Sequence, residues 1–433
     1  MNATYRSRAA AVSLCASILV LLGSSSVSHA KPNKAGGEAP AASSAPLAPG
    51  RTEDKDNEPT VSESGDAFSD ASAAPGSYQL RTLLQTRFQH TAIDLAPIED
   101  RLRAESTSSP DYVRDVILER ARSDDGIGIQ RAFLRATAQP TKAFGAKLLV
   151  DFAEFVHKNQ KNALKLAYGE LRPTHTLSIT AGLFKIPFSL LELLPIAEFE
   201  FADVGPTDAL IKDLGIGGRD IGIKVQVTPL RKRKSLSFEF GAYDGDNHNL
   251  QKNPGPGIVA ARAKVRPVSH LEVASDCAYR PTAVRDVDDG GNPYQKHAKG
   301  GACSVDASFS YHRFAMRGEW MTGKRTDTPL FHDNKDHRFS AVWALASYRV
   351  KLRKKLVLMP ALRVEWLDED QPSRIGQTFL VSGAINLDVA NSTRILFDLS
   401  RSRVQGGTRD RSDTGQLYRP STTTGVAQLQ FKL

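Results

Sequence analysis

The segment AGLFKIPFSLLELLPIAEFEFADVGPTDALIKDLGIGGRDIGIK runs from Ala181 to Lys224. Two short segments with alternating apolar residues flank its long centre, which is partly apolar and partly acidic. The centre is too apolar to lie comfortably in water, and Pro and Gly interrupt it too often for a regular element. We therefore expect residues 187–217 to form a loop that folds inward between the two flanking strands.

An alternation of period two continues through most of the remaining chain. In YQLRTLLQTRFQH, which starts at Tyr78, the apolar residues Tyr78, Leu80, Leu84 and Phe88 share one face, while Gln and Arg occupy the other. This pattern is typical of strands with one apolar and one wet face. The same pattern recurs at 220–227, 236–242, 259–265, 270–279, 313–320, 338–348, 356–366, 378–389 and 393–400.

The connections between these strands alternate between short and long, as they do in outer-membrane barrels with short periplasmic turns and longer external loops. Beyond the first 30 residues no apolar run is long enough for a transmembrane helix. A search for long apolar runs does not detect membrane-spanning strands, because only alternate residues of such a strand face lipid. The sequence therefore predicts an all-β fold, a transmembrane antiparallel β-barrel of about 16 strands over residues 77–433.

The first 76 residues differ from the rest. Arg6 and Arg8 precede an apolar run, and Ser28-His29-Ala30 provides small residues at both cleavage positions, which predicts a signal peptide over residues 1–30. Residues 31–76 are rich in Ala, Pro, Ser and acids and are expected to be a disordered linker. Export fits a barrel in the bacterial outer membrane.

The inward-facing positions are more basic than acidic, and the whole chain has a formal charge of +9. The basic positions assigned to the lumen are Arg81, Arg87, Arg131, Arg135, Lys147, Lys224, Arg262, Lys264, Arg266, Arg317, Arg363, Arg394 and Lys432. The acidic positions are Asp151, Glu239, Glu272, Asp276, Glu319, Glu365 and Asp398. Basic side chains that line a pore favour anions. A barrel interior of simply mixed charge is the alternative.

The expected inward loop, by contrast, is acidic. Its carboxylates are Glu192, Glu198, Glu200, Asp203, Asp208 and Asp213. An acidic constriction repels anions, unless these groups are paired with arginines of the wall or face away from the pore.

Cys277 and Cys303 lie almost symmetrically about Gly290 and Gly291. If residues 281–300 form a hairpin loop, the two cysteines lie on neighbouring strands at a similar height and on the same face. A cross-strand disulfide in an oxidising compartment follows; two buried free thiols remain the alternative.

No catalytic or metal-binding pattern stands out. The ten histidines form no spaced cluster, and no G-x-S-x-G motif is present. The basic segments 231–234 and 351–355 resemble nucleic-acid patches, but in an exported barrel they are expected to be solvated turns. We therefore expect no enzyme activity, no cofactor, no metal and no nucleic-acid partner.

Four stretches resemble the phosphate-selective porin O and P family. They are Arg131–Arg135 (RAFLR), Leu166–Pro173 (LAYGELRP), Gly182–Phe188 (GLFKIPF) and Gly218–Gly222 (GRDIG). The resemblance covers about Tyr78 to Leu433. It implies a 16-stranded outer-membrane porin, usually a homotrimer, whose third external loop folds inward as the constriction and whose second strand is rich in arginine.

Two features depart from that family. Members often carry Glu-Arg near the middle of the loop, whereas here Phe201 follows Glu200. The chain ends in Leu433, where outer-membrane barrels commonly end in an aromatic residue. The first departure puts a preference for phosphate in question.

These observations predict a passive outer-membrane channel for small anions, phosphate or related solutes, embedded in outer-membrane lipid. The cations expected to act on the anion are Arg131, Arg135, Lys224, Arg262, Lys264 and Arg266 in the wall and Lys185 and Arg219 beside the loop. Lys185 and Arg219 have an alternative role, in which salt bridges pin the loop. The alternative function is a non-conducting structural barrel that anchors the N-terminal linker in the periplasm.

Overall fold

A computed structural model describes the barrel part of the chain. The described residues are 75–94, 125–156, 163–195, 199–229, 236–245, 257–281, 284–287, 293–297, 299–326, 336–369, 371, 377–390, 392–405 and 421–432. The predicted signal peptide, residues 31–74 of the predicted linker, and Leu433 lie outside them. Among the described residues no helix is long and apolar enough to cross a membrane.

Strands make up most of the described chain. The first half contains β1 (Ser77–Asp94), β2 (Gly126–Gln139), β3 (Phe144–Asp151), β4 (Leu164–Leu171), β5 (Leu177–Lys185), β6 (Arg219–Val227), β7 (Leu236–Tyr243), β8 (Ile258–Val268) and β9 (Leu271–Arg280). The second half contains β10 (Val284–Val287), β11 (Pro293–His297), β12 (Lys299–Tyr311), β13 (Phe314–Thr326), β14 (Asp336–Tyr348), β15 (Val350–Arg353), β16 (Leu356–Asp368), β17 (Gln377–Val389), β18 (Thr393–Gln405) and β19 (Ser421–Lys432). Three short helices, α4 (Ala153–Val156), α5 (Leu190–Leu193) and α6 (Pro206–Leu214), lie in connections.

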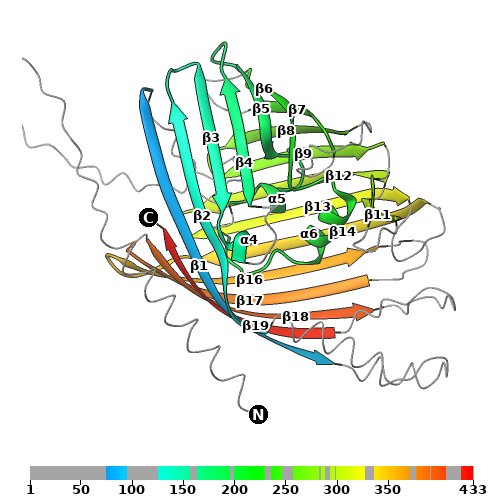
Figure 1. The fold of residues 1–433 in the computed structure, drawn as a ribbon. Coiled ribbons are helices and arrows are strands. Elements are labelled where there is room, and N and C mark those ends of the chain that lie inside the picture. The colour runs from blue at the N-terminus through cyan, green and yellow to red at the C-terminus, as the bar shows by residue number, and fades with distance from the viewer. Residues whose placement is uncertain are drawn as a thin grey trace, which may run out of the picture. The chain divides into compact units, whose positions relative to one another are not determined.

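The strands close into one antiparallel barrel. Each strand pairs with its neighbour in the chain, and β1 pairs with both β2 and β19, which removes the open edges (Figure 1). Strands β14 and β15 both pair with β16 and occupy one position in the wall, while β10 and β11 form a separate hairpin. The wall therefore has 16 positions, as the sequence predicted.

The alternation of the sequence separates an apolar outside from a polar inside. In β17, for example, Phe379 and Ile385 are 44% and 52% exposed on the outer face, while Ser382 and Asn386 are fully buried inside. The period of two places successive side chains on opposite faces. The outer face of the other strands likewise presents large apolar side chains to the surroundings.

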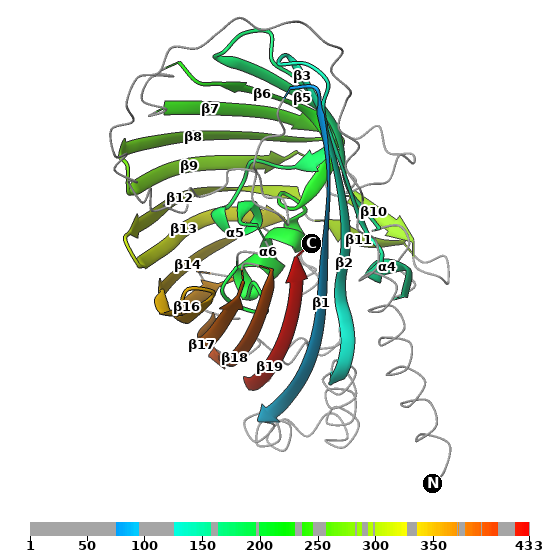
Figure 2. The ribbon, with the colours of Figure 1, turned by 90° about the vertical axis from the view of Figure 1, so that its left-hand side faces the viewer.

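All long connections leave one end of the barrel, the long-loop rim, and all short ones leave the other end, the short-turn rim. The loop between β5 and β6, residues 186–218, starts at the long-loop rim and turns into the barrel. Figures 1 and 2 show its helices α5 and α6 within the ring of strands. The inward path agrees with the sequence prediction. The loop is not one continuous element, and it contains the two short helices α5 and α6.

The two cysteines face each other across neighbouring strands. Cys277 in β9 and Cys303 in β12 are register partners with Cα atoms 4.0 Å apart, and their sulfurs are bonded. Both residues are exposed on the outer face. The bond therefore links two wall strands next to the detached β10–β11 hairpin.

Candidate pore and constriction loop

The constriction loop, residues 186–218, bends at residues suited to sharp turns. Ser189 enters α5 with a φ of 63°, a left-handed conformation that costs free energy for a residue other than glycine. Gly205 precedes α6 and Pro206 is its first residue, where a missing N–H does no harm. Gly215 ends α6 in the left-handed conformation with φ of 61°.

Apolar side chains fix the loop to the wall in two clusters. Phe188, Ile211 and Ile216 are fully buried in a cluster that reaches inward-facing residues of both halves of the barrel. A second cluster joins Phe199 and Phe201 to the wall, including the buried Trp343 in β14. This packing explains why the loop sequence is too apolar for a solvated segment.

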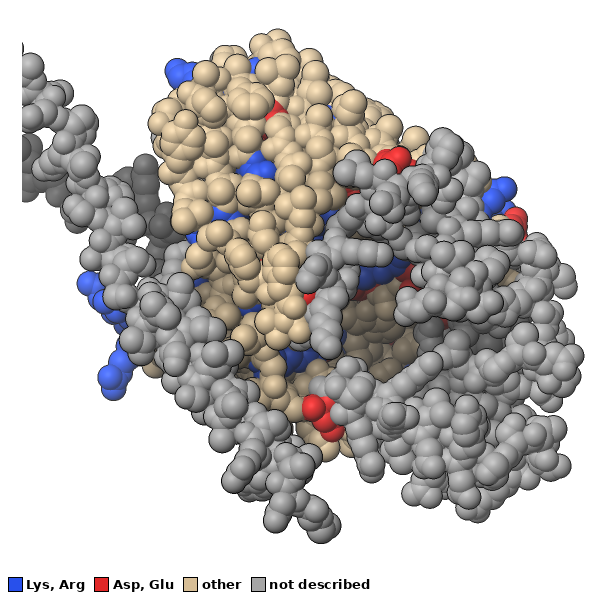
Figure 3. Space-filling view, in the orientation of Figure 1, with Lys and Arg blue, Asp and Glu red and all other residues tan. Residues whose placement is uncertain are grey.

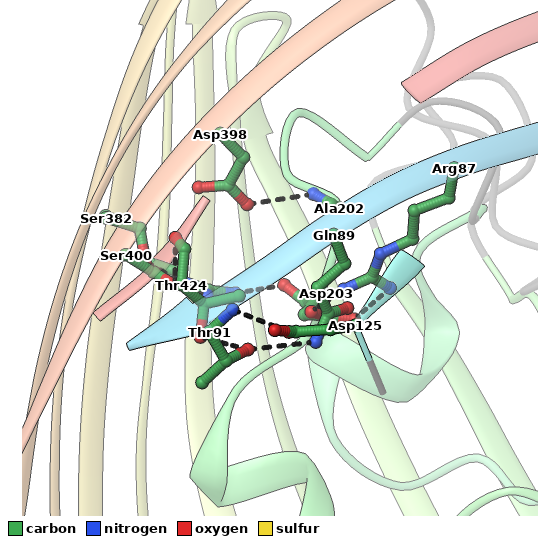
Figure 4. A network of polar contacts seen from close by, with 11 residues as sticks. Arg87, Gln89, Thr91, Asp125, Ala202, Asp203, Ser382, Asp398, Ser400 and Thr424 are labelled. Carbon is green, nitrogen blue, oxygen red and sulfur yellow. Dashed lines mark hydrogen bonds and ion pairs between the residues drawn. The ribbon is translucent and has the colours of Figure 1, made fainter. Parts of the chain in front are cut away.

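Carboxylates of the wall accept hydrogen bonds from the loop backbone. Asp398 in β18 accepts from the amide of Ala202 at 3.1 Å (Figure 4), and Glu365 in β16 accepts from the amide of Thr207. At the entry of the loop, Glu319 in β13 accepts from the Ser189 hydroxyl at 2.9 Å. Acids that the sequence assigned to the lumen thus hold the loop in place.

Arginines of the wall also bind the loop. Arg317 in β13 donates to both carboxylate oxygens of Glu200 at 2.9 Å, and Arg87 in β1 forms an ion pair with Asp203 (Figure 4). Arg363 in β16 donates to the Asp203 carbonyl at 2.6 Å. Two of the loop carboxylates are therefore neutralised by wall cations.

A second pair of loop acids shares one cation within the loop. Lys212 in α6 forms ion pairs with Asp208 and, at 3.8 Å, with Glu192 in α5. Burial and the neighbouring Glu192 raise the pKa of Asp208 well above its usual value. Asp213 is exposed and also has an interaction partner, while Glu198 lies outside the described residues.

The two cations that flank the loop have structural contacts. Lys185 is buried at the end of β5, and its ammonium donates to the backbone carbonyls of Glu192 and Leu194. Arg219 starts β6, pairs in register with Lys185 and is partly buried. For Lys185 this arrangement favours the pinning role over direct contact with a permeating ion.

Three of the predicted wall cations are each joined to a carboxylate of a neighbouring strand. Lys224 contacts Glu239 at 2.8 Å and Arg266 contacts Glu272 at 2.6 Å. Arg262 is 6% exposed and sits between two aspartates of β9 and β12. Lys264 is half-buried on the same inner face as Arg262.

A basic face lies on the inner side of β1 to β3. It consists of Arg81, Arg131, Arg135 and Lys147. Arg81 and Arg135 are register partners, and Arg131 donates to the neutral Gln85 side chain at 2.8 Å. Figure 3 shows Lys and Arg together with Asp and Glu around a hollow on the side of the barrel that it presents.

Sequence reasoning missed Arg280 at the end of β9. Its guanidinium is 1% exposed and donates to the carbonyls of Leu214, Gly215 and Gly245, so it clamps the C-terminal end of α6. The alternation through Asp276 and Ala278 places Arg280 inward and could have identified it. Among the described residues no group of His, Cys, Asp and Glu has the arrangement of a metal site.

Comparison with solved structures identifies the fold. The anion-selective porin from Comamonas acidovorans has 11% identity and a TM-score of 0.53, covering 82% of this chain and 99% of that one. The loop L8 deletion mutant of OmpT, an outer-membrane protein of Vibrio cholerae, has 10% identity and a TM-score of 0.52, covering 83% and 100%. Salmonella typhi OmpF in complex with daunomycin has 10% identity and a TM-score of 0.50, covering 82% and 97%.

No family model and no curated protein sequence matches this chain. At such low identities the structural likeness establishes the fold alone. The chain is thus a transmembrane antiparallel β-barrel with the architecture of outer-membrane porins and an inward loop.

Proposed function

We propose that this protein is a passive outer-membrane channel for small anions, which pass between the constriction loop and the basic face on β1 to β3. Phosphate and related oxyanions are the proposed solutes. The chain reaches the membrane after cleavage of residues 1–30, and the barrel assembles as a homotrimer. No catalytic step is part of this function.

One observation carries the proposal: Glu200 and Asp203 of the loop are each paired with a wall arginine, while Arg81, Arg131, Arg135 and Lys147 gather on one stretch of the inner wall. Glu200 and Asp203 are bound by arginines, and Asp208 and Glu192 share Lys212. In β2, Arg131 is half-buried and hydrogen bonds to the neutral Gln85. Fixed positive charge beside a narrow aqueous path lowers the electrostatic barrier for anions and raises it for cations.

Two further points support anions and phosphate as the solutes and a homotrimer as the assembly. The four motifs resemble the phosphate-selective porin O and P family, which favours phosphate. The Comamonas porin of the same fold is described as anion-selective, and one form of the Vibrio OmpT is described as a trimer.

Reversal potentials in planar bilayers test the selectivity. The wild type should prefer chloride over potassium under a salt gradient, and phosphate should compete with chloride. The double variant Arg131→Gln/Lys147→Gln should lose most of that preference. Arg353→Gln removes an exposed cation at the short-turn rim and is the matched control. A cation-selective wild type, or equal selectivity in all three proteins, refutes the proposal.

The second candidate is a non-conducting barrel. It is favoured by the two apolar clusters, through which the loop reaches inward-facing residues on both sides of the lumen. A folded wild type that shows no single-channel conductance establishes this alternative.

A further inference from the structure

Three basic side chains lie on the outer face of the barrel at the long-loop rim. They are Lys299 in β12, Lys324 in β13 and Arg338 in β14, and all three are exposed. Lys324 and Arg338 are direct register partners, and Lys299 is two residues before the partner of Lys324 in β12. The three cations therefore occupy three adjacent strands at nearly the same height.

These cations differ from those in the lumen. None of the three forms an ion pair or a side-chain hydrogen bond with any residue that the structure describes. Among the described residues, Asp336 adds a carboxylate to this face at the rim, where its Oδ1 accepts from the Thr326 hydroxyl at 2.6 Å. The four described residues Lys299, Lys324, Arg338 and Asp336 together carry a net positive charge at the long-loop edge of an apolar outer surface.

An apolar groove of about 570 Å³ lies beside this patch on the outer face of β6 to β9. Large apolar side chains border it, and small side chains form its floor. Its lining includes Ile223, Val225, Phe240, Val259, Ala261 and Tyr279. In β8 and β9 the lining residues Val259 and Tyr279 lie next to the strand ends at the long-loop rim.

One row of register partners connects the groove to the patch. From β8 to β14 it runs Val259, Tyr279, Gly301, Lys324 and Arg338. The glycine matters, because a Cβ at Gly301 would lie 2.9 Å from the ring of Tyr279. Because Gly301 has no side chain, the ring of Tyr279 can lie between the groove and the cations.

We propose that this face binds an acylated lipid that carries more than one phosphate, of the lipopolysaccharide type. A phosphate group contacts Lys324 and Arg338, a second phosphate contacts Lys299, and an acyl chain lies in the groove. Strands are about 4.8 Å apart, so the three cations extend over about 10 Å, which is more than one phosphate spans. Apolar outer surface below cations suits the boundary between acyl chains and charged headgroups.

This inference rests on the proposed outer-membrane location and not on ion conduction. It also assigns the long-loop rim to the leaflet that holds the phosphorylated lipid. A single-phosphate glycerophospholipid is the competing occupant, and it needs fewer cations than the patch provides.

Binding of the purified, folded full-length barrel to bis-phosphorylated lipid A in detergent tests the proposal. Native mass spectrometry or thermophoresis should show at least tenfold weaker binding for Lys324→Gln/Arg338→Gln than for the wild type. Lys351→Gln/Arg353→Gln removes two exposed cations at the short-turn rim and should bind like the wild type. Removing both phosphates from the lipid should weaken wild-type binding as much as the patch variant does.

The groove is tested separately with Ala261→Phe, which fills it from the outer face. This variant should bind the acylated lipid at least fivefold more weakly, yet bind the deacylated bis-phosphorylated disaccharide like the wild type. Equal binding by the wild type and the patch variant overturns the proposal, and so does equal binding of phosphatidylglycerol and bis-phosphorylated lipid A. If the protein fails to bind the lipid but keeps its anion selectivity, only the lipid site is refuted. If it binds the lipid but is cation-selective, only the proposed anion channel is refuted.

Discussion

Replacing Arg317 with Met removes the cation that neutralises Glu200 in the constriction loop. Glu200 is 3% exposed, and Arg317 donates to both of its carboxylate oxygens at 2.9 Å. The other side-chain contact of this carboxylate is the Ser347 hydroxyl at 3.3 Å. Removing one partner of a buried ion pair typically costs about 3–5 kcal/mol, since the remaining charge is left without compensation.

The barrel itself does not need this pair, because its wall is held by the strand ladder. We therefore expect the cost to fall on the docked position of the loop. At about 1.4 kcal/mol per factor of ten, the population with a detached loop should rise by about two to three and a half orders of magnitude. A detached loop widens the lumen, so single-channel conductance should increase and fluctuate.

The assay is a double-mutant cycle with Arg317→Met, Glu200→Gln and both changes together. Unfolding in guanidinium gives the stability, and planar bilayers give the conductance. Glu200→Gln keeps the shape and removes the charge, so the double variant should recover most of the stability lost in Arg317→Met. The reasoning is refuted if Arg317→Met loses less than about 1 kcal/mol of unfolding free energy and conducts like the wild type. A buried carboxylate left without its partner should destabilise the folded state by more than that.

Three further predictions concern other parts of the molecule. Cys277→Ser should lower the stability by about 3.5 kcal/mol in the chain-entropy view of a disulfide with a sequence separation of 26, seen as a lower guanidinium midpoint than that of the non-reduced wild type; equal midpoints contradict it. Burial and Glu192 raise the pKa of Asp208 in the folded protein above its usual value of 3.8. The contribution of Asp208 to the stability of the folded wild type is therefore fully present below pH 3.8, where Asp208 is protonated, and it is lost as the pH rises through the raised pKa. The melting temperature of Asp208→Asn relative to the wild type should therefore increase from pH 4 to pH 8, and a constant difference speaks against this. Arg280→Met should increase hydrogen exchange of the α6 amides, because it removes donors to the Leu214 and Gly215 carbonyls, whereas unchanged protection shows that the apolar cluster alone holds the helix.

Much of the architecture could be read from the residues because a strand's two faces follow directly from a period of two. Phe379 and Ile385 in β17 alternate with polar and small residues, and that pattern alone separates outside from inside. The same regularity places Cys277 and Cys303 opposite each other once the intervening loop is taken as a hairpin. The apolar residues of the loop likewise indicate that it turns inward, because exposing them to water is unfavourable.

The partner of each charge, in contrast, was decided only by the tertiary structure. Arg317 and Arg131 are both inward-facing arginines in the sequence, yet one is bound to Glu200 and the other to Gln85. Alternation specifies the face of a residue but not what lies across the lumen, because the loop reaches strands more than a hundred positions away in the chain. The sequence thus determined a barrel with a charged interior and an inward loop, and the three-dimensional path of that loop decided which charges hold it and which remain to meet an ion.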